Sequence, residues 1–167
     1  MRDCICRLLG WTRYADIEAQ LGTCSVQDLW KFQLERIEYL RRFTGAMQEA
    51  GIEALVTPQH VMMAPKPNAV ASTGMTLCYT QIFNILDFPA GTIRVTAATR
   101  EDEQAMSSWP AGGGQKDPVE RVVHETMTGI AGMPVSVQCV ALPGRDETCL
   151  RLMREVECQA ALSIPIR

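Results

Sequence analysis

The chain has 167 residues, of which 47% are hydrophobic and 21% charged, and this balance is typical of a globular domain with its own core. Its formal net charge of -3 argues against a general nucleic-acid surface, which needs a concentrated basic patch. No apolar run approaches the roughly 18 residues that span a bilayer, and residues 1–4 do not lead into the apolar region of a signal peptide, so we expect neither a transmembrane segment nor a secretory leader.

The first third of the chain predicts two helices and a strand. Residues 4–21 have an imperfect amphipathic pattern, which predicts a short helix. The next helix is predicted to begin at Ser25, which has capping-box spacing to Asp28, and to end before Gly51; an apolar stripe runs along it. Residues 52–56 predict a short buried strand. A helix followed by a buried strand favours a parallel α/β sheet.

The remaining elements alternate between strands, helices and polar loops. The pattern predicts a proline-containing loop over 58–72, a helix over 74–86, a strand over 92–96, a surface loop over 97–117, a helix over 118–128, a strand over 134–141 and a helix over 146–162. The acidic run Glu101-Asp102-Glu103 falls inside the predicted surface loop, where we expect it to be solvated.

Few residues have the spacing that local chemistry requires. The seven cysteines are odd in number and irregularly spaced, so we expect mostly buried thiols in a reducing compartment rather than disulfides or a zinc site. His60 and His124 lie far apart without a ligand pattern, and we expect no metal and no cofactor. Met62-Met63 could line a pocket, although filling a gap is the preferred interpretation. Local patterns alone indicate an α/β fragment without catalytic residues.

Four blocks of sequence carry a more specific signal. In chain order they are Leu29-Trp30-Lys31-x-Gln33, Leu55-Val56-Thr57-Pro58, the segment from Tyr79-Thr80 through Asn84-x-Leu86-Asp87-Phe88-Pro89-Ala90-Gly91, and Gly132-x-Pro134 extended through residues 135–143 and 149–157. Together they closely resemble fatty-acid amide hydrolases, which are members of the amidase signature family. General amidases lack the string Gln138-Cys139-Val140-Ala141-Leu142-Pro143 and the string Met153-Arg154-Glu155-Val156-Glu157.

The resemblance implies a fold and a part of a site. It implies an α/β fold with a mixed, twisted sheet and surrounding helices, in which residues 1–167 form the C-terminal portion of a single amidase domain. The family hydrolyses amides with a serine nucleophile, a second serine and a lysine, and the Gly/Ser-rich segment that carries them has no counterpart here, so no catalytic residue is assigned. Family positions that line the acyl-chain channel align with Gly74, Leu77 and Gln81, and without gaps with Ile17 and Leu21. Ordinary core packing is the alternative at each of these positions.

The resemblance also implies a substrate and a location. The leading hypothesis is the C-terminal portion of a serine amidase that hydrolyses fatty-acid amides to a fatty acid and an amine. The alternatives are a catalytically inert module that binds an acyl chain or a partner, and an amidase for a smaller, more polar amide. We expect an intracellular location, in the cytoplasm or peripherally on an internal membrane, and no nucleic-acid partner; peripheral membrane contact and a homodimer stay open.

Overall fold

The computed structural model describes residues 22–65, 77–108 and 118–160, and helix α3 is the first element within these ranges. It spans Val26–Glu49, as predicted. The Ser25 side chain accepts a hydrogen bond from the Asp28 backbone N–H at 3.1 Å, which satisfies one of the unpaired donors of the first turn. Gly51 follows the helix with a φ of 67°, a conformation that glycine adopts without a Cβ penalty. The helix predicted over residues 4–21 lies outside the described residues.

The described sheet has three strands in the order β1-β3-β2, with β1 at Ala54–Pro58, β2 at Ala90–Ala97 and β3 at Pro134–Ala141. The prediction of parallel pairing is wrong within the described residues, because both strand pairs are antiparallel. β1 and β2 do run in the same direction, as a strand–helix–strand pattern indicates. However, β3 comes from later in the chain and lies between them. The predicted α/β class, a sheet with surrounding helices, is confirmed.

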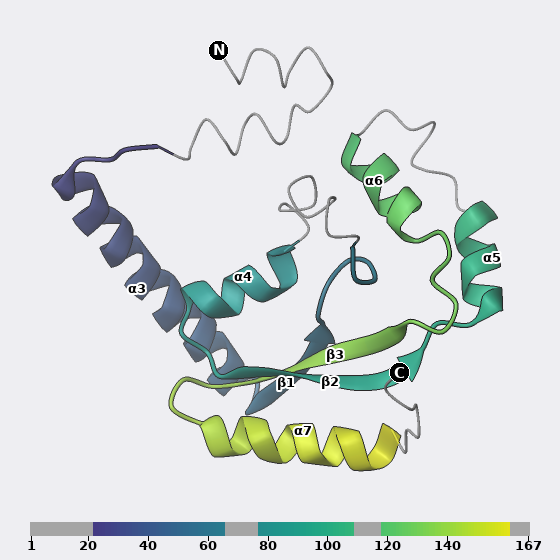
Figure 1. Ribbon diagram of the computed structural model, residues 1–167. Coiled ribbons are helices and arrows are strands. Elements are labelled where there is room, and N and C mark those ends of the chain that lie inside the picture. The colour runs from purple at the N-terminus through teal and green to yellow at the C-terminus, as the bar shows by residue number, and fades with distance from the viewer. Residues whose placement is uncertain (1–21, 66–76, 109–117, 161–167) are drawn as a thin grey trace.

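One face of the sheet packs against α3 and α4, which spans Cys78–Ile85 and connects β1 to β2 (Figure 1). The buried side chains of this cluster are Met47, Phe83, Leu86, Phe88 and Val140. The rings of Phe43 and Phe88 meet edge-to-face with centroids 5.5 Å apart. Arg36 fastens α3 to the end of α4, because its Nη1 donates to the Ile85 carbonyl at 2.8 Å and to Asp87 Oδ2 at 2.7 Å.

The opposite face of the sheet packs against α7, which spans Asp146–Ala160 (Figure 1). Cys149 lies on the inner side of this helix, and its Sγ donates to the Cys139 carbonyl at 3.3 Å. Burial raises the pKa of both thiols, so they are neutral near pH 7. The expectation of buried cysteines is thus confirmed for this pair. It is wrong for Cys24, Cys78 and Cys158, which are exposed.

Two shorter helices follow β2, namely α5 at Arg100–Ser108 and α6 at Pro118–Thr126. The predicted loop over 97–117 is therefore wrong for residues 100–108. The acidic run begins α5 instead: Thr99 N–H and Oγ1 donate to Asp102 Oδ2 at 2.8 and 2.9 Å, and the Asp102 N–H donates to Thr99 Oγ1 at 3.1 Å. This reciprocal cap satisfies early helix donors, and the Thr99 hydrogen bonds lower the pKa of Asp102. None of the described helices is both long enough and apolar enough to cross a membrane.

Candidate functional site

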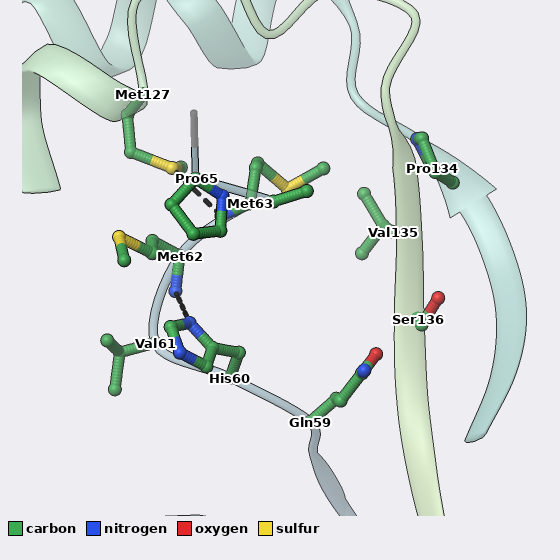
Figure 2. A pocket seen from close by; sticks show the side chains of 11 residues that line it. Gln59, His60, Val61, Met62, Met63, Pro65, Met127, Pro134, Val135 and Ser136 are labelled. Atoms are coloured by element: carbon green, nitrogen blue, oxygen red, sulfur yellow. Dashed lines mark hydrogen bonds between the residues drawn. The ribbon is translucent and has the colours of Figure 1, made fainter. Parts of the chain in front are cut away.

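A pocket of about 470 Å³ lies where the chain leaves β1 (Figure 2). The register explains its position. Pro58, the last residue of β1, pairs with Val137 of β3, so the chain that follows β1 continues beside the first residues of β3. The lining residues are Gln59, His60, Val61, Met62, Met63, Ala64, Pro65, Met127, Pro134, Val135 and Ser136. Three stretches of sequence, 59–65, the residue after α6 and the start of β3, therefore form one cavity.

Two hydrogen bonds hold the wall of this pocket. His60 Nδ1 accepts from the Met62 backbone N–H at 3.3 Å, and the Met63 backbone N–H donates to the Met127 sulfur at 3.3 Å (Figure 2). A ring nitrogen that accepts carries no hydrogen, so neutral His60 holds its hydrogen on Nε2. The second bond ties the segment after β1 to the residue after α6. Together they position Met62, which is buried, and Met63, which is half-buried.

The chemistry of the pocket suits an apolar group. Valine, proline and methionine side chains make up most of its lining, and methionine adapts to irregular apolar shapes. Ser136 lines the pocket, but among the described residues its hydroxyl has no hydrogen-bond partner. An activated serine needs a base within about 2.6–3.2 Å. The described part of the pocket can thus hold an apolar group, and no base within it is hydrogen-bonded to Ser136.

The predicted channel residues do not line this pocket. Leu77 precedes α4 and is 41% exposed, and Gln81 lies one turn later and is also exposed. Four residues apart on a helix, they share one face, which agrees with a common surface but not with a closed cavity. Gln81 has no side-chain hydrogen bond to another described residue. Gly74, Ile17 and Leu21 lie outside the described residues, so the channel stays a prediction.

A buried amide fixes the end of α4 that carries these two residues. Gln138 is 4% exposed, and its Nε2 donates to the Tyr79 carbonyl at 3.1 Å and to Thr57 Oγ1 at 3.3 Å. One side chain of β3 thereby connects β1, β3 and the first turn of α4. The sequence held a signal for this role, a single glutamine in an apolar strand, because a buried amide needs partners. His60, Met127 and Ser136 carried no comparable signal.

The chain is similar in sequence to known amidases. The sequence profile of the family described as Amidase matches residues 13–150. The chain is 37% identical over 147 residues to fatty-acid amide hydrolase 1 of Sus scrofa, and the matched region covers 87% of this chain and 24% of that protein. It is 32% identical over 120 residues to fatty acid amide hydrolase 1 of Caenorhabditis elegans, and the matched region covers 71% of this chain and 20% of that protein.

A solved structure agrees in fold. A fatty acid amide hydrolase structure matches with a TM-score of 0.64 and 18% sequence identity, over 84% of this chain and 24% of that one. At this identity the match concerns the fold alone. The chain thus spans between a fifth and a quarter of the length of these relatives, from 20% to 24%.

Proposed function

Because this chain belongs to the amidase family, we propose that it is the C-terminal portion of a serine amidase that hydrolyses fatty-acid amides to a fatty acid and an amine. One observation carries the proposal: the 37% identity to a fatty-acid amide hydrolase runs through 87% of this chain yet covers 24% of that relative. The serine and lysine residues that break the amide bond would then come from the part of the domain outside this chain.

The described pocket supports a role in substrate binding for this portion of the domain. An amidase needs an activated nucleophile and an oxyanion hole, and it also needs walls that hold the apolar part of its substrate. In the described part of this chain, the pocket beside β1 offers apolar walls of methionine, valine and proline. We infer that this portion contributes to substrate binding. A serine elsewhere in the domain would attack the amide carbonyl and expel the amine, and water would then hydrolyse the resulting acyl-serine ester to the fatty acid and the free serine.

The decisive experiment restores the missing portion. The coding sequence upstream of Met1 would be determined, and the complete protein and the 167-residue chain would be purified separately. We expect the complete protein to release ammonia from a long-chain primary fatty amide and the short chain to release none. Turnover by the short chain alone would contradict the proposal. An upstream sequence without a serine and lysine signature would favour the inert acyl-binding module, and faster hydrolysis of acetamide would favour a small polar substrate.

Gln81 is expected to limit the use of long acyl chains in the complete enzyme. Each methylene buried against an apolar wall gains about 0.8 kcal/mol, whereas an amide left without a partner costs about 1–3 kcal/mol. Gln81→Met should therefore raise kcat/KM for a long-chain amide by about fivefold, the ratio that ~1 kcal/mol supports, with little change for a short one. Gln159→Met, an exposed position on α7, is the matched control. An unchanged chain-length profile would remove this face of α4 from the channel.

A further inference from the structure

A second cavity, on a different part of the fold, is lined by two arginines. It measures about 590 Å³ and lies between the C-terminal half of α3 and the connection from β3 to α7. From α3 it is lined by Arg41, Thr44, Gly45 and Gln48, and from the connection by Leu142 and Arg145. It shares no lining residue with the pocket beside β1. We call it the α3–α7 groove.

The groove gathers hydrogen-bond donors that lack partners. No described carboxylate pairs with the guanidinium of Arg41 or of Arg145. Asp146 follows Arg145 in the chain but does not line the groove. Both arginine side chains are exposed, so their guanidinium groups can reach an oxygen-rich group that enters the groove from solvent.

Gly45 leaves space for such a group. It lies inside α3, where glycine weakens a helix relative to alanine. A Cβ built on it would meet no atom within 4 Å, so packing does not require a glycine here. Its absent side chain instead opens the floor of the groove between Arg41 and Gln48, which lie on the same side of the helix as Thr44.

We propose that the α3–α7 groove binds an oxyanion, a carboxylate or a phosphate, that carries an apolar group. Guanidinium groups match the oxygens of carboxylate and phosphate, and the exposed Gln48 amide adds a donor. Leu142 and the neighbouring apolar side chains, Leu40 and Pro143, form a wall on which an apolar group packs. This inference does not depend on the proposed function, because binding here requires no hydrolysis and no residue of the pocket beside β1.

Isothermal titration of the full 167-residue chain tests the site with four probes: decanoate, decyl phosphate, acetate and inorganic phosphate. We expect saturable binding of decanoate, of decyl phosphate or of both, one molecule per chain. Acetate and inorganic phosphate should bind at least about tenfold more weakly, because they lack the methylenes that pack on the wall. Comparing decanoate with decyl phosphate identifies the preferred head group. Equal affinity for a probe with and without its decyl chain would overturn the apolar part of the proposal.

Substitutions locate the bound probe. Arg41→Gln and Arg145→Gln should each weaken binding by about tenfold or more, because each removes charge-assisted hydrogen bonds. Arg151→Gln changes the net charge equally at an exposed position on α7 outside the groove and should leave the affinity unchanged. Gly45→Leu should block the groove, and circular dichroism would verify that each variant is folded. No saturable binding of either decyl probe, or an equal loss in Arg151→Gln, would overturn the proposal.

Discussion

Replacement of Leu86 by alanine is expected to lower the free energy of unfolding by about 3 kcal/mol. Leu86 is fully buried at the end of α4 and belongs to the cluster of Met47, Phe83, Phe88 and Val140. The substitution removes three carbons, each of which contributes about 0.8 kcal/mol of transfer free energy, and leaves a cavity between α3, α4 and the sheet. The backbone there is held by the Leu86 N–H, which donates to the Ile82 carbonyl at 3.1 Å, so the cavity cannot readily collapse.

Urea denaturation followed by circular dichroism would measure the loss. The matched control is Leu150→Ala on α7, because this leucine is 63% exposed and its truncation should cost less than about 0.5 kcal/mol. A similar loss in both variants would contradict the assignment of Leu86 to the core. Since a chain of this size loses roughly 2–4 °C of Tm per kcal/mol, the core variant should also melt roughly 6–12 °C below the unmodified chain.

The elements that the sequence predicted well are those with strong local signals. The start of α3 follows from Ser25 and Asp28, whose predicted cap is present at 3.1 Å. β3 has the predicted limits, 134–141, because a proline precedes an apolar run and another proline follows it. β1 begins two residues later than predicted, since the Ile52 N–H still donates to the Met47 carbonyl and belongs to the end of the helix.

The errors came from contacts between distant residues and from one overlooked cap. The antiparallel position of β3 between β1 and β2 depends on residues about 80 positions apart, such as Thr57 and Gln138, and no local pattern reports that distance. α5 lacks a strong apolar stripe, so composition favoured a loop. The start of the helix is instead fixed by the cap of Thr99 and Asp102. Glu103, within the helix, connects it to the turn after α6, because its Oε1 accepts from the Gly129 N–H at 2.6 Å.

The candidate site also depends on contacts that local sequence patterns do not predict. Filling a gap is the interpretation that the sequence favours for Met62-Met63, whereas the structure places both residues in the pocket wall. Met127 and Ser136 join them only because β3 inserts beside β1, which the sequence did not predict. The α3–α7 groove has the same origin, because Arg41 and Arg145 are 104 positions apart and line one groove between α3 and the connection from β3 to α7. Residues on separate elements form a site only where the strand order brings those elements side by side.

The largest expected effect belongs to α7. A stop codon after Arg145 removes this helix, which contacts all three strands. The sheet face that it covers includes Cys139 and Ala141, both fully buried, and would become exposed to water. Four inward side chains of α7, namely Cys149, Leu152, Met153 and Val156, supply the packing. At about 1.5–3 kcal/mol for a buried aliphatic side chain, their loss is comparable to the 5–15 kcal/mol that stabilises a typical domain.

We therefore expect the chain ending at Arg145 to lose cooperative thermal unfolding and to aggregate, because an apolar sheet face without a covering helix associates with other chains. Gly91 shows how close α7 lies to the sheet, since a Cβ at this position would overlap the sulfur of Met153. A chain ending at Ala160 keeps the whole helix and is the control. Thermal melts and size-exclusion chromatography would separate the two. A sharp transition retained by the shorter chain would mean that β1, β2 and β3 are held by α3 and α4 alone, and that α7 only adds to a core that is already complete on the other face.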